Sequence, residues 1–234
     1  GMTAQWLLGP YLLYGYPKVA TVGISFMYKL LAISAVCGFV GAISSKMMLL
    51  LDRARQSFKG WTPQLFFVLA CAFVFAGVVY TFGSISLGSG GNLLDAYLFE
   101  DNPNPTFANA AGRVFGNMFT MGAGGAGGIF APALSSGAAI GGLIGSWFSV
   151  DRGELNMLIL GGMCAFLTAV TRSPFTSAIL VLEMTDRHSV IFQLMYACMI
   201  ASIVSHAVDN RSVYDRLKTR LLDQLKLMPP RGKS

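Results

Sequence analysis

Charge is scarce in this sequence. Only 12% of its 234 residues are Asp, Glu, Lys or Arg, whereas soluble domains carry about 25%. Histidine occurs twice, at positions without metal-like spacing, and the four cysteines stand apart in apolar runs with no C-x-x-C pair. These shortages exclude the clusters from which metal centres and nucleophile–base pairs are built. We therefore expect no metal, no catalytic residue and no enzyme, and we expect the cysteines to be small buried side chains.

Hydrophobic residues are abundant, at 54% of the chain, and the mean hydropathy is +0.58. Such values are typical of a polytopic membrane protein rather than of a soluble domain. The net charge of +6 comes largely from two basic groups, one at 53–59 and one in the last 24 positions. The positive-inside rule predicts that both are cytoplasmic. The basic residues are not interleaved with aromatic residues, so we expect no nucleic-acid partner.

The sequence predicts an all-α membrane domain fragment over 1–234. Residues 1–23 are typical of a linking or interfacial segment, 24–208 of membrane helices, and 209–234 of a basic cytoplasmic helix and tail. Within the central part we expect a basic loop at Asp52–Thr62. The apolar pieces differ in length: Ile24–Leu51, Leu65–Phe82, Leu93–Phe99, Thr106–Met121, Phe130–Val150, Leu155–Val170, Phe175–Met184 and Ser189–Val208.

Several of these pieces are too short to cross a bilayer alone, and Gly or Pro separates them. Broken helices are tolerated at membrane depth only where they line a cavity enclosed by protein. Their presence therefore predicts a binding site near the middle of the membrane. A bundle of simple spans would show evenly long apolar runs instead.

A glycine-rich segment, Gly122–Pro132, precedes one of the apolar pieces. It has no side chain that binds a metal or moves a proton. Bare N–H groups at the start of a helix form a positive, donor-rich end that suits an anion. The alternative is that these glycines serve only helix–helix packing, which is the role that we expect for Gly137, Gly141 and Gly145, spaced four apart on one face.

Gly127–Pro132 contains a G-x-F-x-P pattern at the head of a helix-like run, and Gly161–Pro174 is an apolar run that ends in Arg-x-Pro. The first pattern is similar to the signature of the CLC family of chloride channels and chloride–proton antiporters, and the second resembles that family's next helix and its turn. Ile179–Asp186 resembles the I-L-V-L-E-M-T segment, and Ser212–Tyr214 the P-L-Y segment. Ser89–Asn92 matches a Ser-Gly-rich turn earlier in the same half. The order and spacing agree across roughly residues 24 to 228.

The resemblance implies a fold of two inverted halves, of which this chain matches only the C-terminal half. It implies that chloride binds the backbone N–H groups of Ile129 and Phe130, that Gly128 permits close approach, and that the Tyr214 hydroxyl is a neutral donor. No cofactor is implied besides chloride as the transported ligand. The implied partners are chloride, the complementary N-terminal half, the lipid bilayer and a second subunit that forms a homodimer.

The family's central serine motif, its gating glutamate in a G-x-E-G-P segment and its internal proton glutamate belong to the half that this chain does not match. The resemblance therefore implies chloride transport that is either voltage-dependent or proton-coupled. Glu183, the acidic residue within an apolar piece, is either a proton relay or a group that hydrogen-bonds locally. We expect a multi-pass protein of a prokaryotic inner or plasma membrane, with a cytoplasmic C-terminus.

Two other functions are open at the level of sequence. One is a stand-alone structural or assembly module that keeps the fold and transports nothing. The other is a different transporter family with broken helices. Binding of an anion, and a neighbouring coding sequence with a G-x-E-G-P segment, would distinguish both from the chloride pathway.

Overall fold

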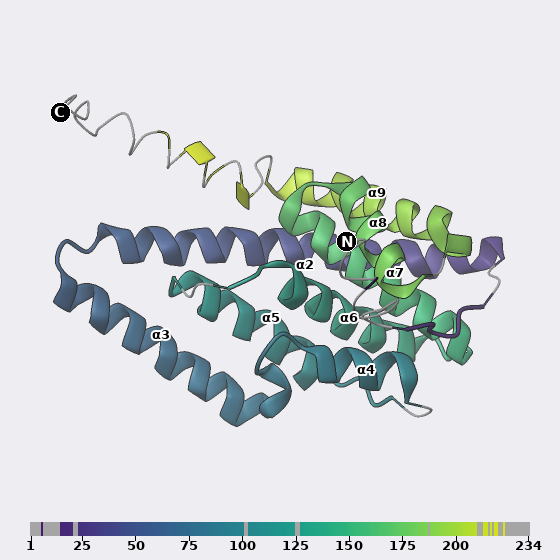
Figure 1. Cartoon of the computed structure of the whole chain (residues 1–234), viewed down its shortest axis with the longest axis horizontal. Helices are drawn as coiled ribbons and strands as arrows, with labels where there is room; N and C mark the ends of the chain where they lie inside the picture. The colour runs from purple at the N-terminus through teal and green to yellow at the C-terminus, as the bar shows by residue number, and fades with distance from the viewer. Residues whose placement is uncertain are drawn as a thin grey trace.

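The computed structural model describes Trp6, residues 15–20, 23–100, 103–124, 127–186 and 188–209, and single positions after them. These single positions are Val213, Tyr214, Arg216, Lys218, Thr219 and Leu222. The described residues form helices and connecting segments (Figure 1). The elements are α2 (Ile24–Ser57), α3 (Trp61–Phe82), η1 (Ser84–Ser86), α4 (Gly91–Phe99), α5 (Phe107–Gly122), α6 (Phe130–Trp147), α7 (Arg152–Thr171), α8 (Pro174–Thr185), η2 (His188–Val190) and α9 (Ile191–Val208).

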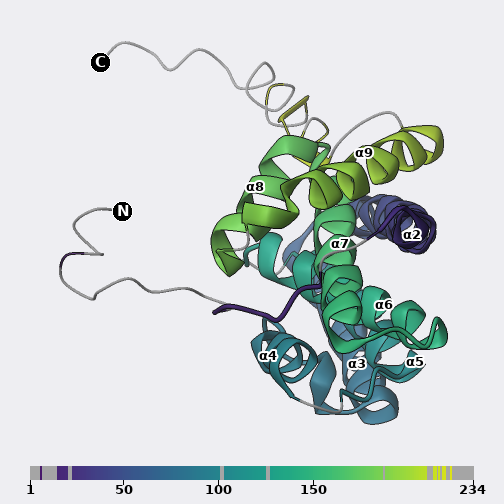
Figure 2. The same ribbon diagram turned by 90° about the vertical axis from the view of Figure 1, so that its right-hand side faces the viewer.

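The α7 helix lies at the centre of the molecule. Figure 2 shows α8 and α9 on one side of it and α4, α5 and α6 on the other. Side chains along its whole length are buried, among them Leu158, Leu160 and Leu167 with no exposed surface. Because α7 is apolar all round, it is stable only inside a larger bundle. The helices around it therefore hold α6, which follows the glycine-rich segment, in a fixed position.

The α6 and α7 helices pack backbone against backbone. A Cβ atom built on Gly137 would lie 2.3 Å from the carbonyl oxygen of Gly162, and one built on Gly141 would lie 2.7 Å from that of Leu158. A Cβ on Gly145 would lie 2.7 Å from a methyl carbon of Leu155. Small residues allow this close approach, so the predicted packing role of Gly137, Gly141 and Gly145 is confirmed.

Within the part of the chain that the structure describes, four helices are long and apolar enough to cross a membrane: α2, α3, α7 and the helical stretch 188–208. The predicted end of the first span at Leu51 is wrong, because α2 continues to Ser57. Asp52 stabilises this extension by accepting hydrogen bonds from Arg55 at 3.0 Å and from Gln56 at 2.9 Å. The predicted loop over Asp52–Thr62 is therefore reduced to the three residues 58–60 between α2 and α3.

The other boundaries differ from the prediction by a few residues. The α6 helix ends at Trp147 rather than Val150, and α7 extends beyond the predicted Leu155–Val170 at both ends. The Asp151 carboxylate accepts a hydrogen bond from the Gly153 N–H and thereby caps α7 at its N-terminus. Most of the predicted segment 1–23 and of the basic helix and tail 209–234 lies outside the described residues.

The α3 helix covers the edge of the bundle (Figure 1). Only Cys71 and Val78 of its residues are buried, whereas Phe66, Phe73 and Tyr80 are more than 70% exposed. An apolar helix with so little buried surface is typical of a face that contacts lipid or another protein. All four cysteines are free and buried, as the sequence predicts.

Candidate functional site

The start of α6 presents backbone donors that have no partner among the described residues. Ile129 is the N-cap residue and has no polar side chain with which to cap the helix, and Pro132 at the third helical position has no N–H group. Among the described residues, no backbone hydrogen bond uses the N–H group of Ile129, Phe130 or Ala131. Three donors therefore remain at the positive end of the helix dipole, where an anion is stabilised.

A cavity of about 460 Å³ opens at this end of α6. Its lining comes from the first turn of α6 and the glycines before it, from α5, from the break between α3 and α4, and from one aromatic ring of α3. The residues are Gly127, Gly128, Ala131 and Pro132, then Gly116, Asn117, Thr120 and Met121, then Ser86, Leu87, Gly88 and Ser89, and Phe75. Two separate breaks in the chain thus meet α5 and α3 around the α6 N-terminus.

The glycines of the segment Gly122–Pro132 do not all pack against another part of the protein. A Cβ atom built on Gly127 or Gly128 would meet no atom within 4 Å, so these two residues border open space rather than a neighbouring helix. Gly122 and Gly124 do lie against other side chains, namely Leu51 and Arg55 of α2. The motif therefore combines two packing glycines with two glycines that leave the backbone accessible. Gly125 and Ala126 lie outside the described residues.

Asn117 of α5 holds the first turn of α6 in place. Its Nδ2 donates to the carbonyl oxygen of Pro132 at 2.8 Å and to the Ser136 hydroxyl at 2.7 Å. The Ser136 hydroxyl also donates to the Pro132 carbonyl at 2.8 Å. These contacts orient the α6 N-terminus toward the cavity that Asn117 itself lines.

Arg113 of α5 is fully buried and holds the break between α3 and α4. Its Nη1 donates to the carbonyl oxygens of Ile85, Leu87 and Gly88 at 3.2, 2.9 and 3.1 Å. Its Nε and Nη2 donate to the Ser135 hydroxyl of α6 at 3.1 and 2.5 Å. The guanidinium thus joins the cavity-lining loop to α6. In the sequence, Arg113 can be singled out because it is the charged residue of the otherwise apolar segment Thr106–Met121.

The predicted site residues are only partly brought together. Gly128, Ile129 and Phe130 are consecutive at the start of α6, and the Phe130 side chain is 41% exposed. Tyr214 is 44% exposed, and among the described residues no hydrogen bond joins it to the α6 N-terminus. Its proposed role as an anion donor therefore depends on where the segment around it is held.

Glu183 is exposed on α8, and among the described residues no hydrogen bond involves its carboxylate. It is not among the residues that line the cavity, and its two predicted roles, proton relay and local hydrogen bonding, stay predictions. The part of the chain described by the structure contains no group of three or more His, Cys, Asp or Glu residues that could hold a metal ion.

The family model and the similar proteins all point to the same family. The family model "Voltage gated chloride channel" matches residues 1–206. A voltage-gated ClC-type chloride channel, ClcB, of Escherichia coli (strain SMS-3-5 / SECEC) is 29% identical over 212 residues, covering 87% of this chain and 49% of the relative. The H(+)/Cl(-) exchange transporter ClcA of Vibrio cholerae serotype O1 is 35% identical over 129 residues, 52% of this chain and 28% of the relative.

Solved structures share the fold. A slow cyanobacterial Cl-/H+ antiporter matches with a TM-score of 0.71 at 22% identity over 95% of this chain, and a CLC-type fluoride/proton antiporter with 0.74 at 19% identity over 91%. This chain covers 53% and 51% of those two chains. It likewise spans about half the length of ClcB.

The helical architecture therefore corresponds to part of the CLC fold, and the described helices are those of a multi-pass integral membrane protein. The relatives named above are channels and transporters rather than enzymes. Because the family model matches most of the chain, this protein belongs to the voltage-gated chloride channel (CLC) family.

Proposed function

We propose that this chain forms one wall of a transmembrane anion pathway and binds chloride at the N-terminus of α6. The observation that carries this proposal is the set of N–H groups at Ile129, Phe130 and Ala131, which have no partner in the described part of the chain, beside a cavity of about 460 Å³. The proposed ligands are the N–H groups of Ile129 and Phe130, with Gly128 leaving room for the ion. The Tyr214 hydroxyl completes this half of the site.

The chemistry of these donors suits transport rather than tight storage. An ion that must enter and leave needs several moderate interactions, whereas a full positive charge at the site would hold it too strongly. Arg113 of α5 is a fully buried cation, and its guanidinium donates to three carbonyl oxygens and to the Ser135 hydroxyl. Its charge therefore acts on these protein acceptors.

The relatives support chloride as the transported ion, because ClcB is described as a chloride channel and ClcA as a proton–chloride exchanger. We propose the same substrate here, with transport that is either voltage-dependent or proton-coupled. We further propose that a complementary half of the subunit completes the pathway. The exposed apolar face of α3, with Phe66, Phe73 and Tyr80, fits such a partner.

We also propose a homodimer in which α8 and α9 form the contact. Large apolar side chains on these helices are exposed, including Phe175 and Ile179 on α8 and Phe192 and Ile203 on α9. The proposed orientation places the C-terminus in the cytoplasm of a prokaryotic cell, in agreement with the basic residues after Asp209. No cofactor is required for passive or proton-coupled movement of chloride through such a site.

Replacing the backbone amide of Phe130 by an ester tests the proposed site directly. A hydroxy acid at position 130 removes one N–H donor and leaves the side chain in place. Loss of one hydrogen bond to a charged ligand corresponds to about 1.5–3 kcal/mol, so chloride affinity should fall by about tenfold or more. Binding is measured by isothermal titration on the chain assembled with the rest of the transport subunit.

The matched control is Phe130→Leu, which changes the side chain and keeps the N–H group. It should leave chloride affinity within about twofold of the wild type, because the side chain is not a proposed ligand. Equal affinity in the ester variant and the wild type would refute the site. Absence of chloride binding in all three proteins would instead favour a structural or assembly module.

A further inference from the structure

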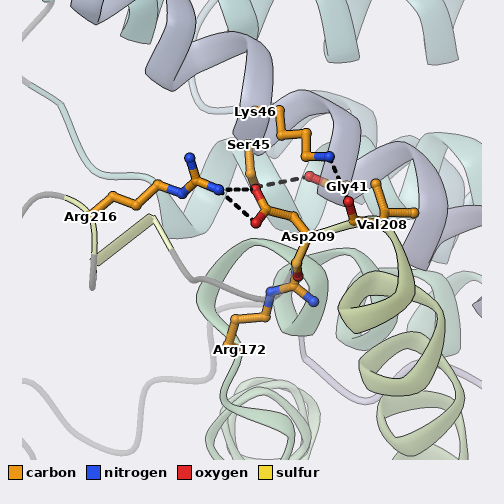
Figure 3. A network of polar contacts seen from close by, with 7 residues as sticks. All are labelled: Gly41, Ser45, Lys46, Arg172, Val208, Asp209 and Arg216. Carbon is orange, nitrogen blue, oxygen red and sulfur yellow. Dashed lines mark hydrogen bonds and ion pairs between the residues drawn. The ribbon is translucent and has the colours of Figure 1, made fainter.

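A polar network joins the ends of α7 and α9 (Figure 3). Arg172 ends α7 in the left-handed conformation, with φ of 62°. Its Nη2 donates to the backbone carbonyl of Asp209 at 2.7 Å, and its Nη1 donates to the Ser205 hydroxyl of α9. Burial lowers the pKa of the Arg172 guanidinium, and the Asp209 carboxylate opposes this effect. Both the backbone and the charge of Asp209 therefore act on Arg172.

The long α2 helix contributes a second cation to the same point. Lys46 Nζ donates to the carbonyl oxygen of Val208 at 2.5 Å, as Figure 3 shows. The carbonyls of Val208, the last residue of α9, and of its C-cap residue Asp209 are thus both held by cations from other helices. Positive side chains stabilise a helix C-terminus in this way. The chain leaves α9 from a fixed position.

The Asp209 carboxylate then pairs with a residue farther along the chain. Arg216 Nη2 donates to both carboxylate oxygens of Asp209, at 2.6 and 2.5 Å. Only 9% of the Asp209 side chain and 21% of the Arg216 side chain are exposed. Because the pair is largely withdrawn from water, it constrains geometry more strongly than a pair on an exposed surface.

Along the sequence, Tyr214 lies between Asp209 and Arg216. Its neighbour Val213 is buried and belongs to the hydrophobic core. The Tyr214 side chain itself is 44% exposed, and among the described residues no hydrogen bond fixes its hydroxyl. The position of Tyr214 is therefore set by its backbone, which the ion pair and the buried Val213 hold on either side.

We propose that Asp209 and Arg216 are positioning residues for Tyr214, and that this ion pair sets the anion affinity to which the tyrosine hydroxyl contributes. The proposal rests on the function proposed above for Tyr214. Ordering a flexible segment only when the ion binds would cost conformational entropy at each transport event. The Asp209–Arg216 pair, on either side of Tyr214 in the sequence, lowers that cost.

The test compares variants that break the pair with variants that preserve it. Asp209→Asn and Arg216→Gln each remove one charge, whereas Arg216→Lys keeps the charge. Lys218→Gln is the matched control, since Lys218 is an exposed basic residue on the same segment. Chloride affinity is measured for each variant in the wild-type and the Tyr214→Phe backgrounds.

We expect Asp209→Asn and Arg216→Gln to weaken chloride binding by about fivefold, in the range of one neutral hydrogen bond. Arg216→Lys should recover most of the affinity, and Lys218→Gln should not change it. In the Tyr214→Phe background the two disruptive substitutions should have no further effect, because the hydroxyl on which they act is absent. Additive losses in that background would overturn the proposal.

A second measurement reports on Tyr214 without any ion. The protein is labelled with 3-fluorotyrosine, and the fluorine resonance of Tyr214 is assigned by its disappearance in Tyr214→Phe. We expect Asp209→Asn and Arg216→Gln to shift or broaden this resonance, and Lys218→Gln to leave it unchanged. An unchanged resonance in both disruptive variants would overturn the positioning role. If the wild type binds no chloride, the proposed function fails, while this resonance still decides whether the pair positions Tyr214.

Discussion

A Cβ atom added to Gly137 of α6 would lie 2.3 Å from the carbonyl oxygen of Gly162 of α7. The reverse contact, from Gly162 to the Gly137 carbonyl, is 2.4 Å. The two backbones are therefore in direct contact, and no side chain intervenes to absorb a shift. Because α7 is buried in the centre of the bundle, this contact fixes the depth at which α6 begins. The position of the proposed anion site follows from it.

Gly137→Ala should therefore destabilise the protein by about 2 kcal/mol, because overpacking a tight helix contact forces the backbones apart. The measurement is thermal or denaturant unfolding in detergent. Gly77→Ala on α3 is the matched control, since a Cβ atom there meets nothing within 4 Å. That substitution should be neutral or stabilise α3 by up to about 1 kcal/mol. Equal stability of the two variants would contradict the close α6–α7 contact.

Arg113→Lys should destabilise the protein by about 2 kcal/mol. The lysine ammonium cannot reproduce the planar fork that reaches both the Ser135 hydroxyl and the carbonyls of the break after α3, so buried acceptors lose their partners. Arg53→Lys, at an exposed position of α2, should change stability by less than about 0.5 kcal/mol. Unfolding measured on both variants separates the role of Arg113 from a general effect of replacing arginine.

Tyr214→Phe should weaken chloride binding by about fivefold and leave the unfolding midpoint unchanged. The substitution removes only a hydroxyl that, among the described residues, makes no hydrogen bond, and one neutral hydrogen bond to the ion accounts for the loss. Isothermal titration gives the affinity. An affinity equal to that of the wild type would remove Tyr214 from the site and leave the α6 donors as its only described part.

The chain alone should not conduct chloride. The unpaired N–H groups at the α6 N-terminus and the break between α3 and α4 need protein or water around them, because an unsatisfied backbone group facing lipid costs several kcal/mol. Chloride flux from liposomes that contain only this chain should equal that of empty liposomes. Flux that depends on the amount of this chain would contradict the proposed need for a complementary half.

The sequence predicted the helices well where apolar residues and glycine breaks dominate. The packing of Gly137, Gly141 and Gly145 followed from their spacing, and the break before Ile129 was correctly placed. The predicted end of the first span failed because charged residues were interpreted as a loop. In the structure Asp52 bonds to Arg55 and Gln56 one turn away, and these local contacts continue the helix.

Contacts between distant parts of the chain could not be predicted. Lys29 of α2 pairs with Glu154 of α7 at 3.1 Å, and Lys46 of α2 donates to the carbonyl oxygen of Val208 at the end of α9. Such pairs depend on how helices far apart in the sequence are packed, which composition and periodicity do not encode. For the same reason, the hydrogen bond between Arg113 and Ser135 could not be predicted, although both are polar residues in apolar segments.

The most direct test of the anion site is anomalous scattering from bromide in crystals of the assembled transporter. Bromide replaces chloride and can be located by its own signal. The proposed function predicts a peak within hydrogen-bonding distance of the backbone nitrogen atoms of Ile129 and Phe130, in the cavity that Gly127 and Gly128 line. Bromide peaks elsewhere in the protein, with none at the start of α6, would contradict it.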